Sequence, residues 1–287
     1  MIEYERVDIE QSIKKEDFLK KYKEKEIPVL IKNLTKDWKA HSKWSLDYFQ
    51  SLAGEREIKL YDSNPAKNKK LQHAAELVIP MQEYFQLLRN GEKNLRMFFY
   101  NILEEIPELR NDFSFPDIGL KFFKKLPVLF LAGKGAKVQM HFDIDYADIL
   151  LCHFGAKKNV ILFSPEQSAF LYHVPFSFSA LNCIDFETPD LEMYPALHKL
   201  KGKKITLVHG DALYIPPGWW HYISYDDISY SLALRAFPRK LKYVVKVLRN
   251  LFWTRTVEGI MRKLFAQKWN DRNERLAMLR TNKGLGV

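Results

Sequence analysis

The segment GDALYIPPGWWH, residues 210–221, carries the strongest structural signal in this chain. It joins a short apolar run to two tryptophans and His221 through the turn residues IPPG. Proline and glycine interrupt regular structure, and an apolar run that ends at such a turn is typical of a short strand. The segment therefore predicts a strand, a tight turn and a second strand that carries His221.

Short apolar runs of the same kind fill the chain from about residue 126. They are PVLFLAG at 127–133, KVQMHFD at 137–143, DILLCHF at 148–154, NVILFSP at 159–165, KITLVHG at 204–210 and YSLALRAF at 230–237. The 20 Phe, 14 Tyr and 6 Trp also favour a β-rich interior. Several short strands at close spacing predict a jelly roll with its core at about residues 126–238.

The first 125 residues alternate between helical and strand patterns. Helices are predicted at 12–22, 44–52 and 81–88, with Ser42 or Ser45 as the cap of the second. Strands are predicted at 27–31, 57–61 and 95–100, and a polar loop at 64–70. The expected fold class is therefore mainly β with flanking α: a jelly roll with N-terminal α/β decoration and C-terminal helices.

After Pro238 the apolar residues repeat with the helical period of 3.6. They fall on two successive faces, Leu241, Val244, Val245, Leu248 and Phe252 on the first, then Val257, Ile260, Met261 and Leu264 on the second. We expect two amphipathic helices and a third, shorter one near 274–279. The expected organisation is one domain at 1–238 and a helical appendage at 239–287.

This appendage carries the whole net charge of +10, because it holds 13 Lys and Arg against three acidic residues. A basic segment of this kind indicates either an anionic partner or a solvated helical face, and both interpretations stay open. Its aromatic pair Phe252–Trp253, close to Arg249 and Arg255, would also suit a membrane surface.

The composition and the missing motifs exclude several classes of protein. A hydrophobic fraction of 47% with 28% charged residues is globular, and no apolar run approaches the roughly 18 residues of a membrane span. Residues 1–16 lack the apolar region of a secretory signal, and Cys152 and Cys183 form no CxxC pair. We expect a cytoplasmic protein. GxSxG, Walker and Rossmann glycine motifs are missing.

Three residues could carry metal chemistry. His141 and Asp143 alternate along one predicted strand and so share a face. His221, after the IPPG turn, could complete the set of two imidazoles and one carboxylate that non-haem Fe(II) oxygenases use. The HxD pattern alone also occurs by chance, and a histidine on an aromatic-rich strand is often a core residue. The surrounding sequence has to decide.

That surrounding sequence resembles the cupin-like branch of the JmjC oxygenases, which includes a protein asparaginyl hydroxylase and a tRNA wybutosine hydroxylase. The resemblance rests on residues 210–221, on KKNVILFSP at 157–165 and on the upstream HxD. SKWSLDY at 42–48 and DFETPD at 185–190 also look like family segments. It covers about residues 25–238 and implies a double-stranded β-helix.

The resemblance implies an Fe(II)- and 2-oxoglutarate-dependent dioxygenase in which His141, Asp143 and His221 hold the metal. The cosubstrates would be 2-oxoglutarate and O2, and the product a hydroxylated C–H bond. Family members modify protein side chains or a tRNA base, so a protein, a nucleic acid or a small molecule is the expected substrate. Family members commonly dimerise through C-terminal helices. We therefore expect a homodimer first, an anionic partner second and a membrane surface third.

The resemblance also assigns residues to 2-oxoglutarate. Aligned on the strand at 160–165, the family's lysine for the distal carboxylate is Lys158, and Lys157 is the alternative. Both lysines could instead be charges that flank a strand. The family's tyrosine that donates to the same carboxylate corresponds to Tyr100, with Phe98 and Phe99 as competing positions that could not donate.

Some positions depart from the family pattern. Val138 stands where a Thr or Ser is common, and Ala233 where an asparagine lies near 2-oxoglutarate. Arg235 could supply another positive group, although a surface arginine is the simpler interpretation. The segment between Asp143 and Ile149 is also longer than usual. These departures keep two alternatives open: a non-catalytic cupin-type binding protein, and a metal-dependent cupin of another reaction type.

Overall fold

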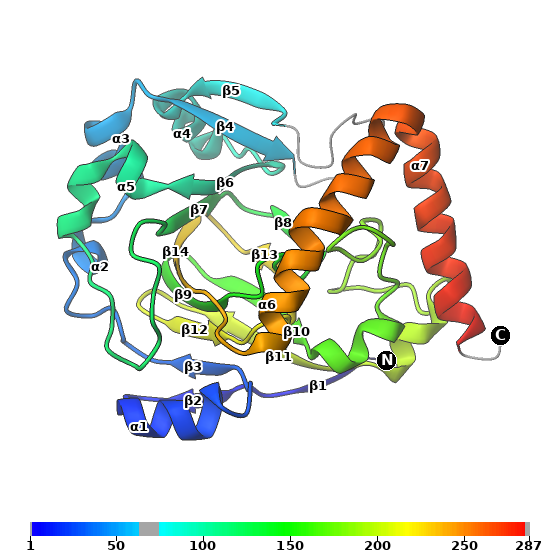
Figure 1. Ribbon diagram of the computed structural model, residues 1–287. Helices are drawn as coiled ribbons and strands as arrows, with labels where there is room; N and C mark the ends of the chain where they lie inside the picture. The colour runs from blue at the N-terminus through cyan, green and yellow to red at the C-terminus, as the bar shows by residue number, and fades with distance from the viewer. Residues whose placement is uncertain (1, 63–74, 285–287) are drawn as a thin grey trace.

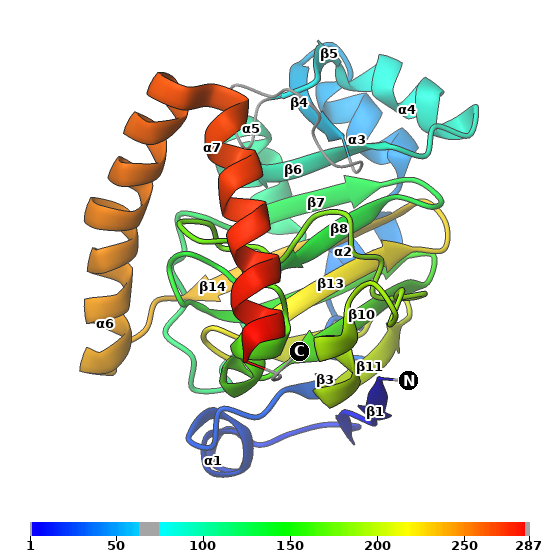
Figure 2. The same cartoon turned by 90° about the vertical axis from the view of Figure 1, so that its right-hand side faces the viewer.

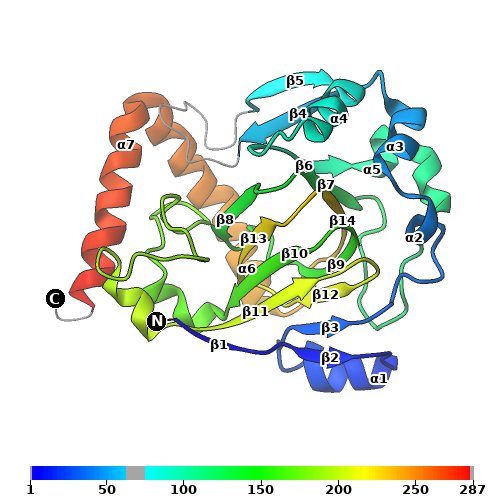
Figure 3. The ribbon, with the colours of Figure 1, turned by 180° about the vertical axis from the view of Figure 1, so that it is seen from behind.

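The computed structural model describes residues 2–62 and 75–284 and has two sheets packed face to face (Figure 1). The smaller sheet, best seen in Figure 3, has five strands in the order β1 (Glu3–Glu5), β11 (Lys201–Leu207), β10 (Lys158–Phe163), β13 (Trp220–Tyr225) and β8 (Lys137–His141). The larger sheet has nine, in the order β2 (Asp8–Glu10), β3 (Val29–Ile31), β12 (Ala212–Ile215), β9 (Asp148–Gly155), β14 (Ser229–Ala236), β7 (Val128–Ala132), β6 (Leu95–Asn101), β4 (Glu57–Asp62) and β5 (Leu77–Pro80).

The eight strands from β7 to β14 form the predicted jelly roll. Strands β7, β9, β12 and β14 belong to the larger sheet, and β8, β10, β11 and β13 to the smaller one. The chain therefore passes repeatedly from one sheet to the other, as in a double-stranded β-helix. The mainly β fold class is confirmed, and the turn at 216–219 does separate β12 from β13.

Inward-pointing side chains from the strands of both sheets fill the space between them. Alternate residues of each strand, such as Leu151 on β9, Leu162 on β10 and Leu213 on β12, meet in one buried apolar cluster. Successive side chains of a strand point to opposite faces, so one half of each strand lines this interior. The same inner faces carry the polar residues of the candidate site.

Short helices cover the outer face of the larger sheet. They are α1 (Lys15–Phe18), continued by the π-helical turn η1 (Leu19–Lys23), then α2 (Lys39–Lys43), α3 (Leu46–Ala53), α4 (Met81–Arg89), α5 (Ile102–Glu105) and the 3-10 turn η2 (Pro107–Asn111). Phe49 and Phe85 from these helices pack with Phe154 of β9. Ser45 is the cap of α3, since its Oγ accepts from the Tyr48 amide at 3.1 Å. The polar loop expected at 64–70 lies outside the described residues.

The C-terminal helices differ from the expectation. Helix α6 (Leu241–Leu248) continues through the π-helical segment η5 (Arg249–Thr254) into α7 (Arg255–Lys283). The prediction of two separate helices and a short third one was wrong. No proline or other breaker separates 252 from 257, and the chain turns back only at Ala266, whose φ of 44° is left-handed. The first arm therefore covers residues 241–265 and the second residues 267–283. Figure 2 shows them in orange and red.

The apolar face predicted for the first arm points away from the body. Leu241 and Phe252 are 75% and 73% exposed, whereas Tyr243 and Asn250 on the other face are buried. The second arm packs on the jelly roll, where the Tyr172 hydroxyl donates to Asn282 Oδ1 at 2.8 Å. Among the described residues, no helix is long and apolar enough to cross a membrane.

A glycine substitution tests the turn before β13. Gly218 has φ +76°, and a Cβ there would lie 2.7 Å from Cε1 of Tyr146. Gly218→Ala should lower the free energy of unfolding by about 1–3 kcal/mol through backbone strain and this clash. Gly259→Ala is the control, because no described atom lies within 4 Å of the added Cβ on this exposed helix. It should raise stability by roughly 0.5–1 kcal/mol. Denaturant unfolding measures both, and an unaffected Gly218→Ala would contradict this turn geometry.

Candidate metal centre and its cavity

The structure brings together the three residues of the predicted triad. His141 ends β8 and stands directly opposite His221 of β13 in the register of the sheet. Their ring centroids are 4.1 Å apart. Asp143 follows two residues after His141, and one potential ligand atom from each of the three lies within 4.8 Å of the others.

Both imidazoles are oriented by their own strands. Nδ1 of His141 lies 2.8 Å from the carbonyl oxygen of Gln139, and Nδ1 of His221 lies 3.1 Å from that of Trp219. We assign the ring proton to Nδ1 in each case, which leaves Nε2 of both rings as a free electron-pair donor. Burial, together with the neighbouring His221, lowers the pKa of His141 to about 3. The ring is therefore neutral, which is the form that binds metals.

Asp143 is held as a carboxylate by Arg235. Nη2 of Arg235 lies 3.4 Å from Asp143 Oδ1 and 2.7 Å from Asp145 Oδ1, and the Arg235 Nε lies 3.2 Å from Asp145 Oδ2. Burial raises the pKa of Asp143, but Arg235 and the two histidines outweigh burial and lower it to about 2. The simpler interpretation of Arg235 as a surface residue was wrong, since its side chain is only 4% exposed.

The donor set fits a catalytic transition-metal site. Two neutral imidazole nitrogens and one carboxylate on the same side of a metal form the facial triad of non-haem Fe(II) proteins. A closed structural zinc site would instead need four protein ligands. Within the described residues, this is the one group of three or more His, Cys, Asp or Glu side chains with ligand spacing.

A cavity extends from the triad between the two sheets. Its lining is largely apolar and includes Val138 and Ala233, the two positions that depart from the family pattern. The further lining residues are Arg96, Phe98, Phe130, Ile149, Leu151, Lys158, Ile215, Ile223, Tyr225 and Arg235. Such a lining excludes water and strengthens the interactions of the few charged groups inside.

Lys158 is the buried cation of this cavity. Its side chain is 1% exposed, and its ammonium donates to Ser231 Oγ at 2.6 Å and lies 4.3 Å from the ring centre of Tyr225. Burial lowers its pKa to about 7. Among the described residues, no carboxylate forms an ion pair with it. Lys157, the alternative from the sequence, is exposed and does not line the cavity.

The structure does not bring Tyr100 into this cavity. A β-bulge between Met97 and Tyr100 shifts the register of β6, and the Tyr100 ring packs in the core cluster beneath the helices. Arg96 and Phe98 of the same strand face the cavity instead. Asp148, the first residue of β9, does not line the cavity and accepts from Lys23 and Tyr214.

Sequence reasoning missed two cavity residues, Tyr225 and Arg96. Tyr225 could have been found, since it follows His221 by four residues on one strand and therefore shares its face. It also stands directly opposite Lys158 in the sheet register. Arg96 carried no such signal, because the bulge decides which residues of its strand point inward.

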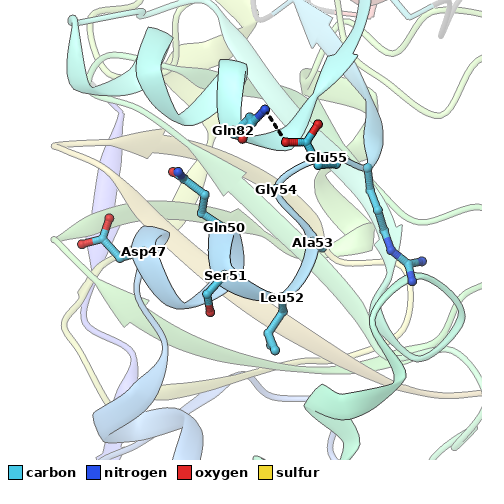
Figure 4. A pocket seen from close by; sticks show the side chains of 9 residues that line it. Asp47, Gln50, Ser51, Leu52, Ala53, Gly54, Glu55 and Gln82 are labelled. Atoms are coloured by element: carbon cyan, nitrogen blue, oxygen red, sulfur yellow. Dashed lines mark hydrogen bonds between the residues drawn. The ribbon is translucent and has the colours of Figure 1, made fainter.

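A second, open hollow lies beside α3 and α4 (Figure 4). Its walls include Asp47, Gln50 and Glu55, and the Gln82 amide donates to Glu55 Oε1 at 2.9 Å. It contains none of the triad residues and no histidine or cysteine. The candidate metal centre therefore lies in the cavity inside the jelly roll and not in this hollow.

The fold agrees with the comparisons to known proteins. The Cupin-like domain matches residues 15–258, and the chain belongs to this family.

The chain is also similar to several known proteins. It is 29% identical over 228 residues to Jumonji C domain-containing protein 5 of Drosophila melanogaster, covering 76% of this chain and 56% of that protein. It is 28% identical over 211 residues to human tRNA wybutosine-synthesizing protein 5, covering 65% and 64%. Lysine-specific demethylase JMJ30 of Arabidopsis thaliana is 26% identical over 239 residues, covering 79% and 54%. The chain thus spans between about half and two thirds of each relative.

The buried ammonium predicts a pH dependence of stability. The folded pKa of Lys158 is about 7 against an ordinary value near 10.5, so the unfolded chain binds more protons between these values. The contribution of Lys158 to stability should therefore rise by up to about 1.4 kcal/mol per pH unit from pH 7 to 10. Lys158→Met should lack this rise.

Denaturant unfolding at a series of pH values, for wild type, Lys158→Met and the exposed control Lys157→Met, measures the difference. Lys157→Met should follow the wild-type curve. Parallel curves for wild type and Lys158→Met would show that Lys158 is not a buried ammonium.

Proposed function

We propose that this chain is an Fe(II)- and 2-oxoglutarate-dependent hydroxylase. The observation that supports this most is the ammonium of Lys158, which is buried in the cavity that contains the triad and has no carboxylate partner in the described part of the chain. A buried cation is costly without a counter-ion. A dicarboxylate that reaches from the metal to Lys158 would supply that counter-ion.

His141, Asp143 and His221 would hold Fe(II) from one side and leave the other side open. Iron together with 2-oxoglutarate and O2 supplies an oxidant that hydroxylates a C–H bond, with release of succinate and CO2. The protein's own part is to orient ligands and cosubstrate. Lys158 pairs with the distal carboxylate, and the apolar walls keep water away from the reacting groups.

The proposed substrates are a protein side chain, a nucleic acid or a small molecule. Relatives of this chain carry names that refer to tRNA wybutosine synthesis and to lysine demethylation, and the excess of basic residues after 238 favours an anionic substrate. The free thiols of Cys152 and Cys183 support the proposed cytoplasmic location, a reducing compartment.

Anaerobic titration of the full chain with Fe(II) and 2-oxoglutarate tests the proposal. Wild type should develop the visible metal-to-ligand charge-transfer band of the chelated 2-oxo acid. His221→Ala should lose iron binding. Lys158→Ala should keep iron but bind 2-oxoglutarate about 10–100-fold more weakly, because one charge-assisted contact is lost. Lys157→Ala is the matched control and should resemble wild type.

Other results would support the alternatives. Bound iron without the band, at saturating 2-oxoglutarate, would favour a cupin of another reaction type. A wild-type chain that binds no iron would be a binding protein.

We also propose a homodimer formed through the first C-terminal arm. Large apolar side chains are exposed along it, namely Leu241, Val245, Leu248, Phe252, Trp253, Ile260 and Leu264. An apolar stripe of this length on a soluble chain marks an interaction surface.

Light scattering should give about twice the chain mass of 33.9 kDa. Phe252→Asp should give the monomer mass, because it places a charge in the contact. Leu279→Asp on the second arm, 58% exposed, is the control and should remain dimeric. A wild-type mass that stays monomeric across the concentration range would overturn the homodimer.

A further inference from the structure

The loop that follows the metal-ligand aspartate is held from outside the jelly roll. The side-chain amide of Asn250, in η5, donates to the carbonyl oxygen of Ile144 at 3.1 Å. The Tyr243 ring of α6 stacks on Tyr146, with ring centres 5.5 Å apart and planes at 24°. The first C-terminal arm therefore contacts the two residues that lie one and three positions after Asp143.

The buried side chains in the first part of this arm are the same ones that contact the loop. From 241 to 253, Tyr243 and Asn250 are the buried side chains, at 4% and 2% exposure. They lie seven residues apart, which is two helical turns, so they share a face. A buried asparagine is unfavourable in an apolar contact unless its amide is hydrogen-bonded. The Ile144 carbonyl supplies that partner.

The loop itself needs external support. Tyr146 has φ +47°, a left-handed conformation that is unfavourable for a tyrosine. Inside the loop, the Tyr146 amide donates to the Asp143 carbonyl at 3.1 Å, and the Ala147 amide to Asp145 Oδ1 at 3.2 Å. Strained backbone persists where surrounding contacts over-determine it. Asn250 and Tyr243 on one side, and Arg235 on the other, are such contacts.

The arm is a firm support because its start is tied to the body. Glu26 accepts from the Tyr243 hydroxyl at 2.6 Å, from Lys240 Nζ at 2.6 Å and from Lys242 Nζ at 3.2 Å. Three donors on one carboxylate fix the entry of α6. Tyr243 therefore connects Glu26, through its hydroxyl, with Tyr146, through its ring.

We propose that Asn250 and Tyr243 are positioning residues for the metal site. They hold residues 144–146 so that Asp143 presents its carboxylate beside His141 and His221. This inference rests on the proposed function, since it takes the triad as the metal site. It gives the C-terminal helix a role in metal binding that is separate from dimerisation, because the two buried side chains lie on the face opposite the exposed stripe.

Cobalt(II) titration of the full chain, followed by its visible absorption, tests the inference without catalytic turnover. Wild type should bind Co(II) through the triad. Asn250→Ala should bind it about 10–100-fold more weakly, the usual effect of losing an outer hydrogen bond at a metal site. Its d–d spectrum should also change, because the Asp143 oxygen is no longer fixed.

The matched control is Asn273→Ala. Asn273 is a buried asparagine on the second arm, 3% exposed, whose Oδ1 accepts from Nη1 of Arg272 in the same helix. It should lose a similar amount of stability in denaturant unfolding and keep the wild-type Co(II) affinity. Two variants of Tyr243 separate its ring contact with Tyr146 from its hydroxyl bond to Glu26. Tyr243→Phe keeps the ring on Tyr146 and loses one of the three donors to Glu26. Its Co(II) affinity should therefore fall less than that of Tyr243→Leu, which loses both contacts.

The possible failures can be told apart. If wild type binds Co(II) and both Asn250→Ala and Tyr243→Leu bind it equally well, the inference is overturned while the proposed metal site stands. If Asn250→Ala does not fold, the two Tyr243 variants decide. If wild type itself binds no Co(II), the proposed function and this inference both fall.

Discussion

The candidate site depends on the register between β8 and β13. That register sets His141 directly opposite His221, and Asp143, two residues beyond the end of β8, lies beside both. A shift by one residue would turn one histidine out of the cavity. The turn at 216–219, in which Gly218 has a positive φ, ends β12 and starts β13 so that His221 enters this register. The backbone of this turn and the three candidate ligands therefore belong to one geometric constraint.

Two buried cations, Arg235 and Lys158, line the cavity of the candidate site, and they differ in their partners. Arg235 is neutralised within the chain by Asp143 and Asp145, so it stabilises the folded state and keeps the ligand ionised. Lys158 has a hydroxyl partner but no acidic one among the described residues. A protein that retains such an ammonium gives up stability at that position. Arg235 is therefore a charge that the chain itself neutralises, whereas the proposed 2-oxoglutarate would supply the counter-ion of Lys158.

The two faces of the C-terminal helix lie in different surroundings. Its apolar stripe is exposed, while its buried face, with Tyr243 and Asn250, contacts the loop after Asp143. The match to the cupin-like family extends to residue 258, past the end of β14 at Ala236 and through the whole of this contact. The exposed stripe and the buried contact with this loop therefore lie on opposite faces of one helix.

Local sequence patterns were enough to predict the jelly roll and the three ligand candidates, because strand alternation, turn residues and motif spacing are local properties. Lys158 came from the resemblance to the JmjC oxygenases, which left Lys157 as the alternative. The other features follow from tertiary packing. The bulge in β6 turns Arg96 and Phe98 inward and Tyr100 outward, and Arg235 meets Asp145 across 90 residues of chain. Likewise, helical periodicity showed that the tail is amphipathic but not which face meets the body. These outcomes depend on how elements remote in sequence pack together, and no local pattern encodes that packing.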